Sequence, residues 1–374
     1  MRALHIPGHP DGQASPYSFP NKPCPPEDLV YSLDFPEPAI PHNPSSHVYI
    51  VQVFATAVTK GELGWAELLE PRRFHSYGGT IPGRDFVGTV QEVVAVKSAE
   101  VPKFQKGDQV WGFAHEDREG AAADRIVVLE TDIARVPRRP TTASEDWLES
   151  LATVPLSGLS AWQALFQHGN LSREKTDDPP RVLITGAAGS VGVICVQLAK
   201  LFGFHVTAVC SPRHSAYLKD QLGVDTIIDY TAPDFSNVPS AMSAHRPVSL
   251  IVDCVGGETA RHILLEPTCV LEGGKIILLA QPLDSYGEET EKKVKKRGRE
   301  VDVDQQFFIV KMDAQQLAEL GTLISDGRLL PQMDAVFPLE QGREAVMRIE
   351  KKGAVERGKV VIRVPYEGEK RTRA

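Results

Sequence analysis

The stretch Thr185-Gly-Ala-Ala-Gly-Ser-Val-Gly192 carries the strongest chemical signal in the sequence. It follows an apolar segment typical of a strand and opens an apolar segment typical of a helix, the context that a dinucleotide-binding turn requires. Measured against G-x-G-x-x-G, Ala187 replaces the first Gly, while Gly189 and Gly192 remain. We expect Gly189 to let the backbone approach a pyrophosphate and Gly192 to let the helix pack against the strand, with N–H groups at the helix start binding the anion. The alternative is a tight turn that binds nothing.

The residues after the next strand discriminate between NAD and NADP. An NAD enzyme usually carries Asp or Glu there, about 20 residues after the glycines, to bind the ribose 2′-hydroxyl. This chain reads Val209-Cys-Ser-Pro-Arg-His214, which contains no carboxylate. Ser211 and Arg213 instead offer a hydroxyl and a guanidinium suited to a 2′-phosphate. NADPH is therefore the predicted cofactor, and the alternative is that Arg213 is an ordinary solvated arginine.

A catalytic zinc needs three protein ligands, usually Cys, His or a carboxylate, and the sequence shows no such set. Arg84, in the stretch Pro82-Gly-Arg-Asp-Phe-Val-Gly88, cannot ligate a metal because its guanidinium is permanently protonated. The five cysteines form no C-x-x-C pair, and the eleven histidines are dispersed. We therefore expect no metal. Without a Lewis acid, a quinone or a C=C bond conjugated to a carbonyl is a better hydride acceptor than an aldehyde.

The elements that must position these residues fall into two groups. The first 45 residues are rich in Pro and predict irregular chain after a short strand at 1–6. Short β-prone runs then suggest a small barrel-like β domain, at 47–55, 85–96, 108–113 and 123–129. A helix at 313–326 and a strand at 359–364 close the chain.

The pattern changes after Pro155, where uncharged strands alternate with helices. Such alternation predicts a parallel, doubly wound sheet. We expect helices at 156–169, 190–202 and 214–222, and strands at 182–185, 205–210, 226–229, 250–253 and 274–279. The basic run Lys292–Arg299 follows an acidic run and predicts a solvated loop.

Composition narrows the class of partner. The chain has 374 residues, 42% hydrophobic and 24% charged, which is normal for a globular protein of two domains. A net charge of −8 argues against nucleic acid and against anionic membranes. The uncharged run from Val182 to Ala199 is too rich in Gly for a confident membrane span. Three cysteines lie in apolar surroundings and the N-terminus shows no signal segment, so we expect reduced thiols and a cytoplasmic location.

With these residues in view, the chain resembles a zinc-free medium-chain dehydrogenase/reductase of the quinone oxidoreductase-like branch. That branch includes reticulon-interacting mitochondrial quinone reductases and fungal enone or enoyl reductases. The resemblance runs from Met1 to Val364, and its landmarks are the stretches 82–88, 107–112, 155–165, 186–192, 229–230, 253–257, 307–310 and 358–362. It implies a GroES-like β domain formed by residues 1–157 and 311–374, an intervening Rossmann domain at 158–310, and a possible homodimer.

The resemblance also implies a set of cofactor-binding residues. Those near the pyrophosphate are Ala188, Gly189, Ser190, Val191 and Gly192. Those around the 2′-phosphate are Ser211, Arg213 and Tyr230, with strand-end packing as the alternative for Tyr230. Those near the nicotinamide are Val255, Leu279, Gln281, Phe307, Phe308 and Ile309.

Two departures from the family pattern leave the substrate contacts open. Relatives often have Asn-Pro-x-Asp in the substrate cleft, where this chain has Thr59-Lys-Gly-Glu62, and the charged insertion at 285–304 is longer than expected. The weak candidates for a proton donor are Lys60, Glu62, Trp65 and Tyr77, each more readily interpreted as structural. Arg84 and Asp85 are interpreted as a structural ion pair, or a turn leading into a strand, rather than a catalytic pair.

Three functions fit these residues. The first is an NADPH-dependent enone or quinone reductase. The second is an enoyl reductase that acts in trans on a carrier-bound acyl chain and would need a docking face for the carrier. The third is a protein that binds NADPH without catalysis, since a fold does not fix a function.

Overall fold

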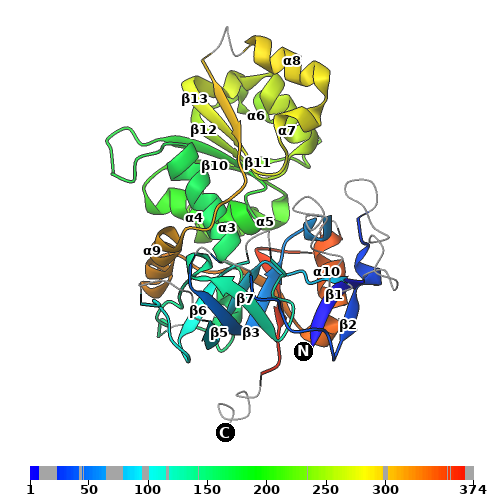
Figure 1. The fold of residues 1–374 in the computed structure, drawn as a ribbon. Helices are drawn as coiled ribbons and strands as arrows, with labels where there is room; N and C mark the ends of the chain where they lie inside the picture. The colour runs from blue at the N-terminus through cyan, green and yellow to red at the C-terminus, as the bar shows by residue number, and fades with distance from the viewer. Residues whose placement is uncertain are drawn as a thin grey trace. The chain divides into compact units, whose positions relative to one another are not determined.

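Figure 1 shows the fold of the chain as a computed structural model. The structure describes residues 1–7, 23–41, 44, 46–64, 79–94, 101–114, 118–141, 143–233, 235–297, 302–351, 353 and 355–366. Two compact units make up the chain. Unit 1 comprises Met1–Leu156 and Met312–Ala374, and unit 2 comprises Ser157–Lys311. The first unit therefore contains both ends of the chain.

Unit 1 is built on a seven-stranded sheet, in which six strands follow the order β15-β16-β3-β5-β6-β8 and β7 pairs with β3. Its strands are β3 (Val48–Val58), β5 (Asp85–Val94), β6 (Gln109–Phe113), β7 (Arg125–Leu129), β8 (Ile133–Arg135), β15 (Met333–Pro338) and β16 (Lys359–Arg363). A three-stranded sheet adds β2 (Val30–Ser32), β1 (Ala3–Pro7) and β4 (Gly79–Thr80). The helices in the described part of this unit are α2 (Trp147–Leu151), α9 (Ala314–Ser325) and α10 (Gly342–Glu350).

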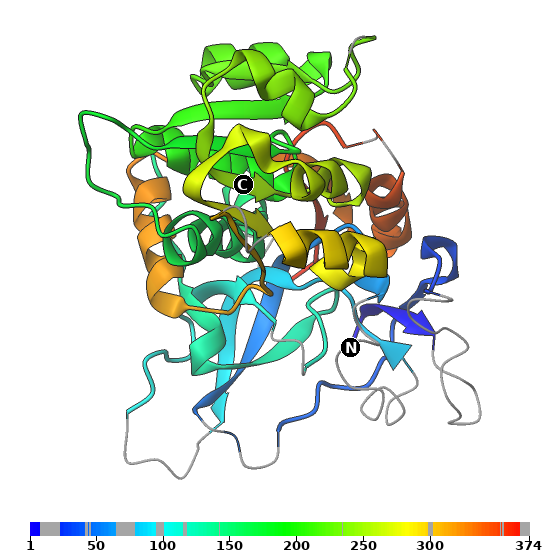
Figure 2. The same ribbon diagram turned by 90° about the horizontal axis from the view of Figure 1, so that it is seen from above.

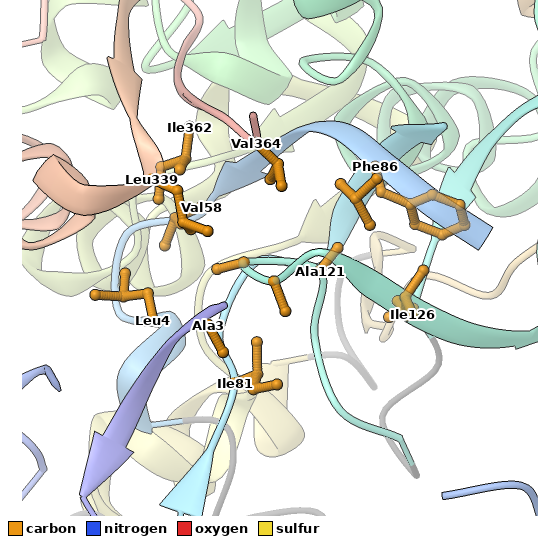
Figure 3. Close-up of a cluster of buried hydrophobic side chains, with 14 of the residues drawn as sticks. Ala3, Leu4, Val58, Ile81, Phe86, Ala121, Ile126, Leu339, Ile362 and Val364 are labelled. Carbon is orange, nitrogen blue, oxygen red and sulfur yellow. The ribbon is translucent and has the colours of Figure 1, made fainter. Parts of the chain in front are cut away.

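The core of unit 1 joins the two ends of the chain. Leu4 from β1 and Ile362 from β16 belong to one cluster of buried side chains, together with Phe86 from β5 and Ile126 from β7 (Figure 3). Strand β16 pairs antiparallel with β3, with Ile362 opposite Thr56. Burial of this shared apolar surface is the main term that holds the terminal segments to the sheet.

Unit 2 is a six-stranded parallel sheet in the order β11-β10-β9-β12-β13-β14. The strands are β9 (Arg181–Thr185), β10 (His205–Cys210), β11 (Thr226–Asp229), β12 (Val248–Asp253), β13 (Val270–Leu278) and β14 (Asp304–Phe307). The helices are α3 (Pro155–Trp162), which begins at the unit boundary, α4 (Ser190–Leu201), α5 (Pro212–Ala216), α6 (Val238–Ala241), α7 (Gly257–Leu265) and α8 (Glu288–Arg297). The strand order reverses between β9 and β12, and doubly wound folds bind ligands at such a point. The predicted α/β class, with a β domain and a Rossmann sheet, is confirmed.

The predicted loop over the basic run Lys292–Arg299 is wrong for its described part, because residues through Arg297 form α8. Glutamates in the first turn form ion pairs with lysines four residues later, as in Glu288–Lys292 at 3.1 Å and Glu289–Lys293 at 2.7 Å. Acids at the start and bases at the end of a helix also suit its dipole. Figure 2 shows α8, in yellow, next to α7, with which it shares contacts.

Other differences from the sequence predictions are smaller. The helix expected at 156–169 continues past α3 as a π-helix at Gln163–His168, and the helix expected at 214–222 begins earlier, at α5, and continues as a π-helix at Tyr217–Gln221. Strand β13 begins four residues before the predicted 274–279. Elements α2, α6, α7, α10, β2, β4, β8, β14 and β15 were not predicted. None of the helices in the described part of the chain combines the length and the hydropathy that a membrane span requires.

Candidate cofactor-binding site

The glycine-rich turn connects β9 to α4 at the point where the strand order reverses. Gly186 has a φ of +59°, which favours glycine. A Cβ on Gly192 would lie 2.2 Å from the Gly186 carbonyl oxygen, so the first turn of α4 sits directly on the backbone of the preceding loop. A Cβ on Gly189 would meet one atom only, the same oxygen at 3.1 Å. Gly192 is thus required for packing, whereas Gly189 leaves open space at the start of the helix.

A buried carboxylate joins this turn to the loop after β12. The Thr185 hydroxyl donates to Asp253 Oδ1 at 2.6 Å, and the Gly256 N–H donates to Asp253 Oδ2 at 2.8 Å. The Thr185 oxygen also accepts from the Cys254 N–H at 3.0 Å. Burial raises the pKa of the Asp253 carboxyl, and the hydrogen bond from Thr185 opposes that shift. Asp253 lies within one landmark of the family resemblance, but no local signal reveals its partner 68 residues away.

Three residues predicted near the nicotinamide meet at the carboxyl ends of β12 and β13. Val255 is 52% exposed beside Gly256, which has a φ of +72°. Gln281 accepts from the Gly257 N–H through Oε1 at 2.9 Å and so braces this loop. The Leu279 N–H donates to the Asp253 carbonyl at 2.9 Å, which continues the β12–β13 pairing beyond the strand end.

The predicted 2′-phosphate residues follow the ends of two neighbouring strands. Strands β10 and β11 are paired with Cys210 opposite Asp229, so Ser211 and Tyr230 come directly after an aligned pair. Tyr230 is 50% exposed. The Asp229 carboxylate lies at this edge too, but its Oδ1 accepts from the N–H and hydroxyl of Thr231 at 2.8 and 2.7 Å. Arg213 is exposed and donates from Nε to His214 Nε2 at 2.9 Å.

Two neighbouring residues after β14 differ in exposure: Phe308 is packed inside unit 2, and Ile309 is exposed. Phe308 is buried, and its ring stacks on His168 at a centroid distance of 4.1 Å within unit 2. Ile309 is 64% exposed. Of the residues predicted here, Phe308 therefore stabilises unit 2, and Ile309 is the one that presents its side chain outward.

In unit 1, Glu62 and Lys60 differ sharply, although both were weak candidates for a proton donor. Lys60 is exposed. The Glu62 carboxylate is buried and accepts from the Thr59 N–H at 2.7 Å and from the Gly83 N–H at 2.6 Å. Burial raises the pKa of Glu62, and the charge of Arg84 opposes that shift. The other two candidates, Trp65 and Tyr77, lie outside the described residues.

Arg84 is a buried cation near two carboxylates. Its Nη1 donates to the Arg118 carbonyl at 2.8 Å, and its charge offsets part of the rise that burial causes in the pKa of Glu62 and of Glu119. Burial outweighs that effect at Glu119, whose pKa rises to about 7 while its carboxylate accepts from the Ile81 N–H at 2.7 Å. This arrangement places a permanent positive charge near one buried and one half-buried carboxylate, whose ionised forms it stabilises.

Of the two structural alternatives for Arg84 and Asp85, the ion pair is wrong, because Asp85 pairs with Lys359. The turn leading into a strand agrees with the structure, since Asp85 is the first residue of β5. The Asp85 and Lys359 side chains are almost fully buried, and Asp85 also accepts from the Leu156 N–H at 2.6 Å. The sequence separation of 274 residues explains why the true partner was missed. The interpretation of Asp85 as structural agrees with these contacts.

No group of three or more His, Cys, Asp or Glu side chains that could hold a metal ion occurs within the described ranges. All five cysteines are free thiols. A hollow of about 440 Å³ lies in unit 1 and contains none of the predicted site residues. Its lining is Lys103, Phe104, Glu130, Ile133, Ala134, Arg135, Pro137, Arg138, Ala314, Ala318, Gly321, Thr322 and Ser325.

Comparison with known proteins places the chain in a family. Residues 222–362 match the family described as zinc-binding dehydrogenase. A probable zinc-binding oxidoreductase, mitochondrial, from Arthroderma benhamiae is 33% identical over 339 residues, which cover 88% of this chain and 91% of that protein. The mouse NAD(P)H oxidoreductase RTN4IP1, mitochondrial, is 29% identical and covers 79% of this chain and 74% of its own length.

The fold also matches solved structures. The quinone oxidoreductase from Coxiella burnetii superposes with a TM-score of 0.75 at 23% identity, over 98% of this chain and 99% of that one. Taken with the parallel sheet, the glycine-rich turn and the relative at 33% identity, this likeness leads to one conclusion. The chain belongs to the zinc-binding dehydrogenase family, among the quinone oxidoreductase-like medium-chain dehydrogenases/reductases.

Proposed function

We propose that the protein is an NADPH-dependent reductase that transfers hydride, without zinc, to a quinone or to a C=C bond conjugated to a carbonyl. The observation that carries this proposal is the turn between β9 and α4. The close contact of Gly192 with Gly186 holds the start of a twelve-residue helix at the reversal of strand order, and Gly189 leaves space there. Relatives named as oxidoreductases support the same reading.

The chain's own residues would bind and orient the cofactor. The backbone N–H groups at the start of α4 suit a pyrophosphate, because they point along the helix dipole. Ser211, Arg213 and Tyr230 would contact the 2′-phosphate at the ends of β10 and β11. The Asp253 carboxylate would fix the two loops on either side through Thr185 and Gly256. The bound nicotinamide supplies the hydride.

Residues of unit 1, to which we assign the contacts with the hydride acceptor, favour a substrate that is already electrophilic. Arg84 is buried, and it cannot serve as a metal ligand. The carboxylate of Glu62 is used by two backbone N–H groups, which argues against a general acid at that position. Hydrogen bonds in the site would stabilise the negative charge that develops on the acceptor oxygen, and water would supply the proton.

Oxidation of NADPH in the presence of quinones, small enones and acyl thioesters tests the proposal. Turnover of quinones or enones supports it, while turnover of acyl thioesters alone would favour a trans-acting enoyl reductase. Tight NADPH binding with no turnover on any acceptor would favour the non-catalytic function instead. Metal analysis belongs to the same experiment, since one zinc per chain, removed together with activity by a chelator, would contradict the zinc-free mechanism.

The cofactor assignment has its own test. Arg213→Ala should raise the KM for NADPH about 10- to 100-fold, the cost of losing a hydrogen-bonded charged group, and leave the KM for NADH within about two-fold. Arg246→Ala is a matched control, because Arg246 is also an exposed arginine of unit 2 but precedes the amino end of β12. Equal effects of Arg213→Ala on the two cofactors would refute the assignment.

The division of labour between the units and the cellular setting are also proposals. We assign the cofactor to unit 2 and the acceptor contacts to unit 1, with a homodimer as the assembly to be tested by light scattering. The five free thiols support a reducing compartment, and we propose the cytoplasm. Subcellular fractionation tests this directly, since the two relatives named above are called mitochondrial.

A further inference from the structure

The hollow in unit 1 is lined by none of the residues that the proposed function uses. Its walls are the chain at Lys103–Phe104, the strand β8 with the residues that flank it, and one face of α9. All of these segments belong to unit 1, and α9 packs against β8. Its volume of about 440 Å³ lies within the range of roughly 300–1,000 Å³ that small-molecule sites occupy. The hollow is therefore a second candidate binding site.

The floor of the hollow is apolar, and the hydroxyl groups beside it are already engaged. The buried side chains of the lining are Phe104, Ile133, Ala134 and Pro137. On α9, the Thr322 hydroxyl donates to the Ala318 carbonyl at 3.1 Å, and the Ser325 hydroxyl donates to the Gly321 carbonyl at 3.0 Å. These hydroxyl hydrogens are used within the helix, so the lining suits an apolar chain better than a sugar or another neutral polar ligand.

Basic side chains outnumber acidic ones in the lining, with Lys103, Arg135 and Arg138 against Glu130. Lys103 pairs with Glu130 at 3.4 Å, and Arg135 pairs with Asp108, outside the lining, at 2.9 Å. Arg138 is exposed, and no carboxylate in the described part of the chain pairs with it. One guanidinium is therefore left to bind an anion, and its N–H groups match the two oxygens of a carboxylate.

The basic groups and the apolar floor meet at the same side of the hollow. The Arg135 guanidinium carbon lies 5.5 Å from the centre of the Phe104 ring, and Nη2 of Arg135 donates to the Lys103 carbonyl at 3.2 Å. A ligand with a negative head and an apolar chain can therefore use both surfaces at once. Burial of the chain contributes affinity, and the charge selects which amphipathic molecule binds.

We propose that this hollow binds a fatty acyl carboxylate, with the carboxylate on Arg138 and the chain against the apolar floor. The single negative charge matches the single guanidinium that has no ion pair. The chain carries no polar group that the floor would have to satisfy. This inference is independent of the proposed function, because none of the cofactor-binding residues lines the hollow.

Calorimetric titration of the whole chain tests the site, with decanoate as the probe and decanol and acetate as comparison ligands. Decanol lacks the charge and acetate lacks the chain, so we expect decanoate to bind more tightly than either. Arg138→Ala should weaken decanoate binding about ten-fold and leave decanol binding unchanged. This factor is the lower end for a hydrogen bond to a charged group, because Arg138 is exposed.

Filling the hollow tests where the chain lies. Ala318→Leu should weaken the binding of decanoate and of decanol, because the larger side chain occupies the space for the chain. Ala318 is exposed, so the fold should tolerate the change, and the unfolding transition of the variant checks this. Thr322→Leu is a second substitution in the lining should Ala318→Leu fail to fold. The matched controls are Arg139→Ala and Gln315→Leu, which change exposed neighbours outside the lining and should bind decanoate as the parent does.

Four results would overturn the proposal. The first is no binding of decanoate, and the second is equal affinity for decanoate and decanol. The third is decanoate affinity that is unchanged by Arg138→Ala or by the folded variant that fills the hollow, because the ligand would then bind differently or elsewhere. The fourth is a dimer in light scattering that Ala318→Leu dissociates, because the hollow would then be a contact between copies of the chain.

Discussion

Replacing Gly192 by Ala is the most direct test of how the turn between β9 and α4 works. The added Cβ would lie 2.2 Å from the Gly186 carbonyl oxygen and 2.8 Å from the Ala187 Cα. Ordinary contacts of a Cβ begin at 3.4 Å, so an overlap of more than 1 Å must be relieved. Both neighbours are backbone atoms, and no side chain can rotate out of the way. The turn or the helix must therefore shift as a body.

The magnitude follows from this geometry. Overpacking costs about 1–3 kcal/mol in a well-packed interior, and a backbone clash belongs at the upper end of that range. For a unit of the size of Ser157–Lys311, each kcal/mol lowers the melting temperature by about 2–4 °C. We expect the transition of unit 2 to fall by about 6–12 °C. The Gly186 carbonyl that must move also accepts from the Gly189 N–H at 2.8 Å, so NADPH binding should weaken more than ten-fold.

Gly189→Ala is the matched control. Its Cβ would meet only the Gly186 oxygen, at 3.1 Å, an overlap of about 0.3 Å that a small shift relieves, so we expect a melting temperature near that of the parent chain. If the cofactor backbone approaches Gly189, NADPH affinity should still fall. Calorimetry and NADPH fluorescence titration measure the two quantities separately. A stable Gly192→Ala protein with normal affinity would refute the packing argument, and normal affinity in Gly189→Ala would refute the pyrophosphate assignment.

Three further substitutions test polar groups that are buried or half-buried. Lys359→Met should cost about 3–5 kcal/mol in urea unfolding, because it leaves the buried Asp85 carboxylate without its cation; a loss below about 1 kcal/mol would contradict the ion pair. The Glu119 pKa is raised from 4.5 to about 7, so the ionised form is disfavoured in the folded chain and stability falls as pH rises across that window. Glu119→Gln should therefore be more stable than the parent by up to about 3 kcal/mol at pH 8 and equal to it at pH 4, and a difference that does not change with pH would refute the assignment. Thr185→Val should cost about 1–3 kcal/mol and weaken NADPH binding, since Asp253 loses a donor; unchanged affinity would show that the two loops are not coupled through this carboxylate.

The sequence was a good guide where the signal is local. The β9–turn–α4 unit was predicted within one residue at its ends, because an apolar strand, spaced glycines and an apolar helix are all read within about twenty positions. The same local reading failed for α8. The high charge of this segment led to the prediction of a solvated loop. Its glutamates and lysines are spaced four residues apart, however, and such pairs stabilise a helix.

Contacts between distant positions were beyond such reasoning. Asp85 was placed beside Arg84 because the two are adjacent in sequence, yet its partner Lys359 comes from the other end of the chain. Likewise Thr185 and Asp253 are 68 residues apart and meet only because β9 and β12 are neighbours in the sheet. Strand order is a property of the whole fold, so the residues that brace the candidate site can be recognised only after the sheet is known.

Arg84 is the residue that bears most directly on the proposed zinc-free mechanism. The stretch Pro82–Gly88 contains a buried guanidinium, and its charge opposes the rise in the pKa of Glu62 and of Glu119. Two acids in a poorly solvated site need a compensating cation, and a covalently attached arginine supplies one at every pH at which the protein folds. A divalent metal would have to share that site with a charge that repels it. Under the proposed function, the acceptor must therefore bring its own electrophilicity, and the protein's contribution is to hold donor and acceptor in place.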